Sequence, residues 1–473
     1  MQEKQINLSV KEEQKRKFLL TGNIFSVILQ IGFPIALFQT LNVLFRLFDS
    51  FVATQINTEA ASIVAYFSQV NNILSGIGTG FAMGAGILIS RAYGKGDYKE
   101  VKSRISTMLG ISLLMSVFLI LAILPFATPF LRAIGTPDVF IDKGQFYFQI
   151  EFISTMALFF NSAYLAVERV QGNTKRILKI NLLSTVLRLG LTSAGVFLMG
   201  QGILFVAFSS LVSQLVIMAV GFWFLIGKSE VFCFSLKAIS FKWGFILPML
   251  LISFPIMVER SAFSLGKVMV SSMISQYGPL LVGALGITNL LVLTAISAQS
   301  GFQEAAANLI AQSSSRENND RTAKSAQALF LTNMTHSILL FIPAYVFRYP
   351  ITSLFAANDP AFHYILVTTY TFDIWSILGF GALTSAMGLL MGLGKTKLTL
   401  LINIFRIFLF RIPVLWWLQN FTDVGMEQAG LVMLISNLAG GLLAFIIGLR
   451  ILSTFKNNQA LKQVLPRKTL TCD

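Results

Sequence analysis

The sequence predicts an all-α membrane protein of twelve transmembrane helices, arranged as two parallel six-helix repeats. Two observations predict this fold class. The 473 residues are 55% apolar and only 12% charged, with a mean hydropathy of +0.72. No soluble core could absorb that much apolar surface. The second half of the chain also repeats landmarks of the first half at a constant spacing, which indicates a duplicated structural unit.

Twelve apolar stretches of roughly 20 residues or more are long enough to cross a hydrocarbon layer of about 30 Å. Several exceed the minimum length, so we expect tilted or kinked helices. The stretches lie near 24–54, 62–94, 105–126, 142–167, 177–199, 203–227, 243–275, 283–313, 326–347, 362–391, 398–419 and 428–452.

The repeat is clearest in the turn Gly172-Asn173-Thr174-Lys175, which returns in the second half as Gly394-Lys395-Thr396-Lys397. Each half has six helices, an even number, so both halves enter the membrane from the same side. The repeats are therefore parallel, and such duplication is typical of transporters. Further landmarks keep the same offset to within one position: Phe33-Pro34 with Phe254-Pro255, Gln55 with Gln276, Gly80-Phe81 with Gly301-Phe302, and Asn181 with Asn403.

The formal charge of +15 indicates the orientation of the chain rather than a nucleic-acid site. Of the 36 Lys and Arg residues, 27 fall at the termini, in the five loops on the same side or at the helix ends beside them, whereas Arg132, Lys143 and Arg348 fall on the other side. The positive-inside rule predicts that both termini are cytoplasmic in a multi-pass protein of the cytoplasmic (inner) membrane. No polar domain displays basic charge to a nucleic acid, so we expect no such partner.

These patterns divide the chain into five parts. We expect a cytoplasmic segment at 1–22, a first lobe at 23–227, a cytoplasmic linker at 228–242, a second lobe at 243–452 and a cytoplasmic tail at 453–473. Cys233 and Cys472 fall in the linker and the tail, which argues against a disulfide or a thiolate metal site.

Proline and glycine mark where the helices bend and pack. Pro34 and Pro255 occupy the same place in the first helix of each half, where a missing amide donor favours a kink. We take both as hinge candidates, with a local bend as the alternative. The second helix carries five glycines that suit close helix packing: Gly76, Gly78, Gly80, Gly84 and Gly86.

The second predicted helix is followed by Ser-Arg-Ala-Tyr-Gly-Lys-Gly-Asp at 90–97. This motif resembles the turn after the second helix of the multidrug and toxic compound extrusion (MATE) family, nearer its bacterial DinF-like members, and it is the most specific match. The two Gly-x-Thr-Lys turns, Asp49 in the first helix and Ser264-Leu265-Gly266 in the seventh also match. The likeness covers nearly the whole chain.

The resemblance implies two six-helix lobes that form a V, with substrate in a central cavity and alternating access driven by Na⁺ or H⁺ entry. Asp49 is the matching candidate for cation coupling, with an ion pair to Arg46 or Arg188 as the alternative. Where DinF-like relatives place an Asn and an Asp in the fifth helix, this chain has Gly190 and Ala194. A single carboxylate provides too few oxygen ligands to bind Na⁺ well, so we favour H⁺ as the coupling ion. We expect no metal site and no other cofactor.

Ionisable residues within apolar segments cost about 2.5–3.5 kcal/mol each, so each is a functional candidate with an expected partner. Glu259 and Arg260 are neighbours about 100° apart on the seventh helix, so one of them should face the cavity. Asp373 and Arg411 fall in the outer halves of their helices and form a plausible pair. Glu304 could form an ion pair with Lys267 or Arg406.

The apolar segments contain more arginine than we expect for a cavity that binds cationic drugs, which should favour acidic or aromatic surfaces. We take Glu259, Arg260, Arg188, Asp373 and Arg411 as substrate-cavity candidates. A small amphipathic substrate that is anionic or zwitterionic would suit them, because Arg pairs with carboxylate and phosphate. The alternative is that every Arg is neutralised internally.

The predicted function is a secondary active antiporter that exports small amphipathic compounds. We expect a monomer in contact with membrane lipids. A flippase for lipids or lipid-linked saccharides is the alternative. An enzyme is disfavoured, because two histidines without metal-ligand spacing provide no catalytic constellation.

Overall fold

The computed structural model describes residues 8–56, 58–133, 136, 138–200, 202–226, 230–274, 277, 279–356, 359–423, 425 and 428–464, and their side chains except those of 45–62, 65–66, 69, 139, 268, 279, 428 and 455–464. Among these residues, twelve helical spans are long and apolar enough to cross a membrane. The predicted number of spans is therefore confirmed.

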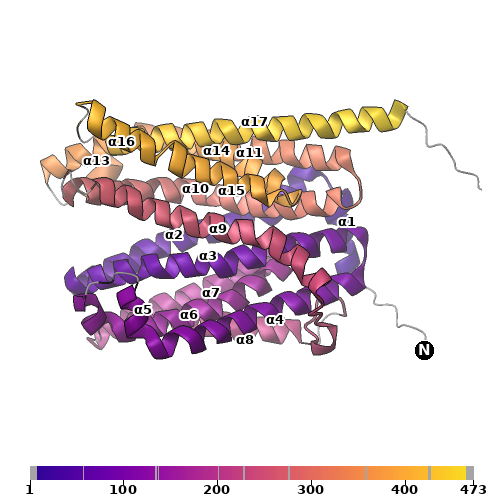
Figure 1. Cartoon of the computed structure of the whole chain (residues 1–473), viewed down its shortest axis with the longest axis horizontal. Helices are drawn as coiled ribbons and strands as arrows, with labels where there is room; N and C mark the ends of the chain where they lie inside the picture. The colour runs from indigo at the N-terminus through magenta and orange to yellow at the C-terminus, as the bar shows by residue number, and fades with distance from the viewer. Residues whose placement is uncertain are drawn as a thin grey trace, which may run out of the picture.

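Six of these spans fall in the first lobe, whose helices lie side by side (Figure 1). Helix α3 packs on α6, α6 packs on α8, and α7 packs on both α8 and α2. A short α5 (Ala127–Ala133) follows the third span. The spans are built from α2 (Ile24–Ile56), α3 (Thr58–Lys95), α4 (Tyr98–Ile123), α6 (Asp138–Val170), α7 (Thr174–Ser193) and α8 (Ile203–Leu225).

The second lobe repeats this plan, but its fourth span breaks into two helices. The fifth span contains a π-helical turn in both lobes, at Ala194–Leu198 in the first and at Phe405–Leu409 in the second. A short α12 (Arg348–Ser353) follows α11. The helices are α9 (Trp243–Ile274), α10 (Pro279–Ser314), α11 (Asn319–Val346), α13 (Pro360–Asp373), α14 (Ser376–Gly392), α15 (Thr396–Ile404), α16 (Ile412–Phe421) and α17 (Gln428–Val464).

An additional helix, α1 (Val10–Thr21), precedes the first span and contacts both lobes. Its start is fixed by a capping box in which Ser9 and Glu12 satisfy each other's backbone amides. Lys15 donates a hydrogen bond to the Asn173 side chain in the first lobe. Arg321 of the second lobe donates to the carbonyl of Leu19 at 2.7 Å. Helix α1 therefore ties the lobes together at one end of the molecule.

We call this end the basic end, defined by α1, the turns at Gly172 and Gly394, and the linker. Both turns need a left-handed backbone, with φ of +72° at Gly172 and +68° at Gly394. Glycine adopts this conformation without steric cost. The repeated turns are therefore equivalent corners of the two lobes, as the sequence predicts.

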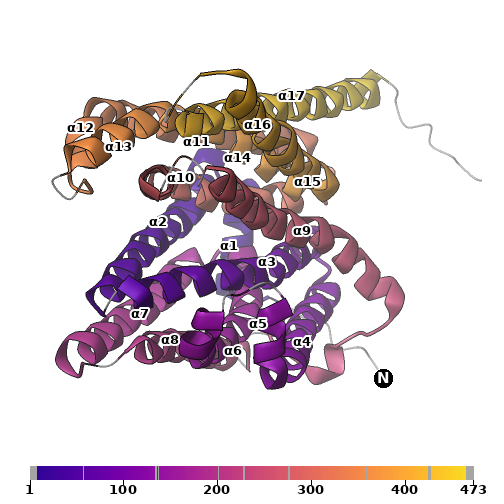
Figure 2. The same ribbon diagram turned by 60° about the vertical axis from the view of Figure 1, so that its left-hand side comes forward.

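The lobes share a core near the basic end and separate toward the opposite end. One buried cluster joins Phe81 and Tyr93 of the first lobe to Phe302 and Leu329 of the second. The clusters farther away belong to one lobe each, around Phe148 in the first and Leu366 in the second. This arrangement produces the predicted V-shaped pair of lobes (Figure 2).

Glycines allow the lobes to touch where they cross. A Cβ on Gly84 of α3 would lie 2.4 Å from Ser253 Cα of α9, and one on Gly301 of α10 would lie 2.4 Å from Ala36 Cα of α2. Such distances exclude any larger residue without movement of the backbone. The predicted role of the α3 glycines in helix packing is confirmed at Gly84.

Candidate functional site: a polar cavity between the lobes

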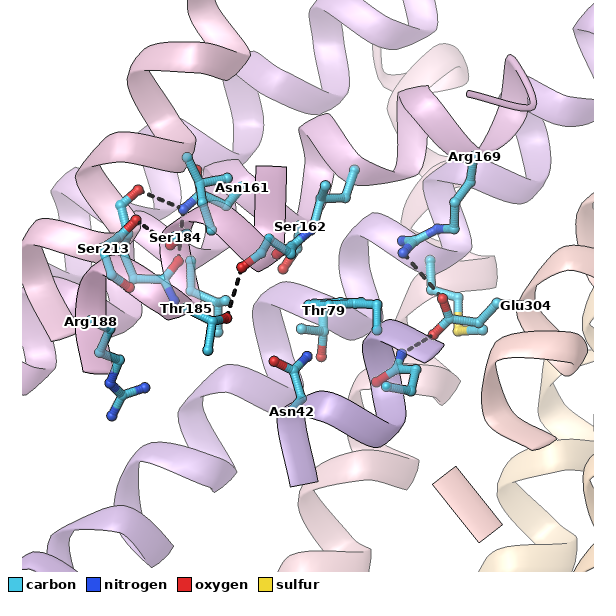
Figure 3. A pocket seen from close by; sticks show the side chains of 18 of the residues that line it. Asn42, Thr79, Asn161, Ser162, Arg169, Ser184, Thr185, Arg188, Ser213 and Glu304 are labelled. Carbon is cyan, nitrogen blue, oxygen red and sulfur yellow. Dashed lines mark hydrogen bonds and ion pairs between the residues drawn. The ribbon is translucent and has the colours of Figure 1, made fainter. Parts of the chain in front are cut away.

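A cavity of about 360 Å³ lies on the inner face of the first lobe (Figure 3). Helices α2, α3, α6, α7 and α8 supply most of its wall, and the second lobe adds Arg260 and Glu304. Its lining is rich in amide and hydroxyl groups, including those of Asn42, Thr79, Asn161, Ser162, Thr185 and Gln214. Polar groups of this kind can orient a ligand among apolar neighbours.

Glu304 forms a bridge between the lobes on the side of the cavity nearer the basic end. Its carboxylate lies 3.1 Å from Arg169 Nη1 of α6 and 3.9 Å from Arg260 Nη2 of α9. Gln39 of α2 donates to the same carboxylate at 3.5 Å. The sequence left Lys267 or Arg406 as the partner of Glu304; the structure pairs it with Arg169 and Arg260 instead. Glu304, which lies on α10, therefore contacts α2, α6 and α9 on this side of the cavity.

The opposite side of the cavity carries Arg188, which Figure 3 shows apart from the Arg169–Glu304 pair. Between the two, Asn161 donates to the backbone carbonyl of Gln214 at 2.9 Å and to its side-chain oxygen at 2.8 Å. Thr185 donates to the Asn181 carbonyl at 2.7 Å. These bonds fix the polar wall before any ligand arrives.

A second cavity of about 500 Å³ adjoins the first and is lined mainly by α3, α9 and α10. Thr79 and Arg260 line both cavities. Arg260 reaches Thr79 Oγ1 at 3.4 Å and Met83 Sδ at 3.3 Å, and its side chain is 37% exposed. It therefore stands at the boundary, where it can interact with a solute on either side.

Glu259 turns away from Arg260 into the second lobe. Asn403 of α15 donates to Glu259 Oε1 at 2.7 Å. Within the described part of the chain, Glu259 Oε2 and Asn403 Oδ1 are both buried without a hydrogen-bond partner. A buried carboxylate that is held by a neutral amide can accept a proton.

Asp373 and Arg411 lie in the interior of the second lobe, each 2% exposed, and line neither cavity. Ser376 donates to Asp373 at 2.9 Å and receives a bond from Asn437 at 3.0 Å. Arg411 donates to Asn437 at 2.9 Å and to Ser436 at 3.0 Å. The two charges therefore belong to one network that is bridged by neutral side chains.

Arg406 lies between two aromatic rings of the second lobe. Its guanidinium carbon lies 4.6 Å from the Phe263 ring centre and 5.1 Å from that of Phe380. Its side chain packs on Gly440, where a Cβ would lie 2.9 Å from two of its carbons. Cation–π contacts of this kind stabilise a desolvated arginine.

The remaining candidates lie elsewhere. The side chains of Asp49 and Arg46 fall outside the described residues. Pro34 lies within the unbroken α2 and Pro255 within α9. Gly32 and Ala36 flank Pro34 and meet Phe302 and Gly301, so this proline stands between two inter-lobe contacts of its helix. In the same way, Pro255 lies between Ser253, which meets Gly84, and Met257, which meets Gly80.

The sequence reasoning named Asp373 but missed the polar network around it, and it did not place Arg169 in the cavity. Arg169 precedes a basic turn and was counted among the orientation charges, although it lines the cavity. The motif Asp373-x-x-Ser376 also repeats Glu151-x-x-Ser154 at the offset of the Gly-x-Thr-Lys turns. A comparison of acidic positions at that offset could have found the second relation.

A family model described as MatE matches residues 34–193 and 255–417, two segments whose starts keep the spacing of the internal repeat. The chain belongs to the MatE family. This finding confirms the resemblance to MATE transporters, and the family consists of transporters rather than enzymes. The DinF-like branch stays a prediction.

Relatives of this MatE chain span most of its length. The Probable multidrug resistance protein YoeA of Bacillus subtilis (strain 168) is 24% identical over 79% of this chain and 82% of its own. An outward-facing multidrug resistance MATE family transporter superposes with a TM-score of 0.87 at 17% identity, covering 93% of this chain and 98% of that one.

A MOP superfamily transporter from Pyrococcus furiosus, described with a binding pocket of reverse polarity, gives the same TM-score, identity and coverage. At this identity the two solved structures establish the fold of the present chain. It is a multi-pass membrane protein with the MATE architecture.

Proposed function

We propose that this protein is a secondary active antiporter that exports small amphipathic compounds by alternating access. The observation that carries the proposal is the polar cavity on the inner face of the first lobe, to which the second lobe adds Arg260 and Glu304. Membership of the MatE family and the multidrug resistance relative support the same function. The resemblance implies a central cavity for substrate, and the polar cavity lined by both lobes is in keeping with it.

We propose that the basic end faces the cytoplasm, in line with the positive-inside rule. The lobes then meet on the cytoplasmic side and separate toward the outside. The cavity would release its solute outward in this state, and export would require the inter-lobe contacts at Gly84 and Gly301 to open. Pro34 and Pro255 are the proposed hinges, and the transport unit is a monomer.

We propose a carboxylate as the coupling group. Asp49 remains the first-lobe candidate. Glu259 is a second candidate, because its Oε2 atom is buried without a hydrogen-bond partner among the described residues, while Asn403 donates to its Oε1 atom. Protonation of that oxygen would remove a buried charge, and H⁺ entry could in this way drive the conformational change.

The test is efflux from proteoliposomes that contain the purified full chain. An imposed proton or Na⁺ gradient should accelerate release of a trapped fluorescent amphipath, and the gradient that works identifies the coupling ion. A rate of release that is unchanged by either gradient would contradict antiport.

Two variants separate the coupling candidates. Asp49→Asn and Glu259→Gln keep the size of each side chain but remove its titration. The essential one should abolish gradient-driven release, a loss of about 100-fold or more. Gradient dependence that is unchanged in both variants would remove both residues from coupling.

The flippase alternative has less support. Cavities of about 360 and 500 Å³ suit small molecules. A lipid-linked saccharide would need a larger chamber with a lateral opening to the bilayer. Movement of labelled lipid between leaflets of the same proteoliposomes would favour the flippase.

A further inference from the structure

We infer that the second cavity is an anion subsite that receives the acidic group of an amphipathic substrate on its way out. This inference rests on the proposed transport function and adds the chemical class of the substrate. It begins from one face of α9, where cationic and hydroxyl side chains alternate along the cavity wall: Arg260, Ser264, Lys267 and Ser271.

The spacing of these residues places them on a single stripe. Separations of four, three and four residues return to nearly the same side of an α-helix. Arg260 and Lys267 lie seven residues apart, which corresponds to about 10 Å along the axis. An acidic group can therefore move from Arg260, at the boundary between the cavities, to Lys267 along a wall in which Ser264 lies between the two cations.

The charge of the combined lining is strongly positive. Among the described residues that line the two cavities, the basic side chains are Arg169, Arg188, Arg260 and Lys267, and Glu304 is the acidic one. The second cavity has no acidic residue in its described lining. Lys267 also interacts electrostatically with Asp373, which lines neither cavity. A cationic drug would meet net repulsion here.

The remaining walls suit an amphipathic molecule. Lys267 Nζ lies 4.8 Å from the ring centre of Phe263, which lines the cavity and also contacts Arg406. The other side of the cavity is apolar and comes from Val270, Leu285, Leu293 and Met433. Asn72 and Asn289 add amide donors. A carboxylate, sulfonate or phosphate on an aromatic body fits these groups, because charge-assisted hydrogen bonds and apolar burial are both available.

The experiment compares two dyes with one xanthene core, anionic fluorescein and cationic rhodamine 123. Binding to the purified full chain in detergent is measured by fluorescence polarisation. Wild type should bind fluorescein at least about tenfold more tightly, as expected for one retained charge-assisted contact. Lys267→Met should weaken fluorescein about tenfold and change rhodamine 123 less than twofold.

Lys324→Met is the matched control, because Lys324 is an exposed lysine paired with Asp320 at 2.7 Å on the surface of α11. It should leave both affinities unchanged. Arg260→Met provides a second variant at the boundary and should weaken fluorescein similarly. Melting temperatures establish that each variant is folded.

Equal affinity for both dyes, a preference for rhodamine 123, or an unchanged fluorescein affinity in Lys267→Met would overturn the anion subsite. A different set of results would contradict the transport proposal. Gradient-driven efflux of rhodamine 123 but not fluorescein would retain the antiporter and reject the subsite. Selective fluorescein binding without gradient-driven efflux would retain the subsite and reject the antiporter.

Discussion

The two lobes have the same scaffold but place their polar side chains differently. In the first lobe, Asn161, Thr185 and Arg188 project from long helices toward a cavity. In the second lobe, Asp373 and Arg411 are enclosed in a network at the points where helices break. The fourth and fifth spans of the first lobe therefore present polar groups to a cavity, whereas Asp373 and Arg411 in the same spans of the second lobe are enclosed by protein.

The helix breaks give a physical reason for this difference. Non-helical backbone at membrane depth is tolerated where protein buries it. The break after Asp373 brings Ser376 back onto its carboxylate, and α17 provides Asn437 and Ser436 for the arginine. The corresponding α6 runs unbroken through Glu151 and Ser154. Duplication of a sequence motif thus did not duplicate its backbone.

The largest predicted effect is on stability and comes from a substitution that disrupts the network around Asp373 and Arg411 in the second lobe. Arg411→Met would remove one of the two cations that interact electrostatically with the buried Asp373, the other being Lys267, and Asn437 and Ser436 would lose a donor. We expect a loss of roughly 3 kcal/mol in the free energy of unfolding. Thermal unfolding of the purified protein in detergent measures it.

Arg260→Met is the control for that experiment, because its contacts are longer and its side chain is 37% exposed. It should cost less than about 1 kcal/mol. Equal destabilisation by the two variants would contradict the division between an enclosed network and an open cavity.

A second prediction concerns the contact between the lobes. Glu304→Gln removes the charge that holds Arg169 and Arg260, so the packed basic end should open more often. Ser90 is fully buried and donates to Asn308 across the lobes at 2.7 Å. In a Ser90→Cys background with Cys233 and Cys472 replaced by serine, thiol labelling should accelerate about tenfold.

Glu100→Gln offers a matched control, since Glu100 pairs with Arg104 within the same helix at 2.6 Å. Labelling in this variant should remain at the background rate. If Glu304→Gln also stays at that rate, the ion pair does not hold the lobes together.

The smallest predicted effect compares the two prolines. Pro34→Ala and Pro255→Ala would each restore an amide donor and straighten the helix. We expect a two- to threefold slower gradient-driven efflux with little change in unfolding, because each proline lies between inter-lobe contacts. A rate equal to that of wild type in both variants would reduce the prolines to local bends.

Much of the fold could be predicted from these residues. Continuous apolar stretches determine the number of spans, and the turns at Gly172 and Gly394 mark equivalent corners because both need positive φ. The site was less predictable. Arg169 looked like an orientation charge, and Asp373 and Arg411 looked like cavity residues, because a linear position indicates depth in the membrane but not which neighbours surround a side chain.

The sequence by itself determined the spans, the parallel duplication and the family, since these depend on hydropathy and spacing along the chain. The tertiary structure alone decided that Glu304 joins Arg169 and Arg260, that Glu259 turns to Asn403, and that Arg406 lies between two rings. The physical reason is that partners across helices are set by the rotation and crossing of each helix. Those depend on close contacts such as Gly84 with Ser253, which no local pattern specifies.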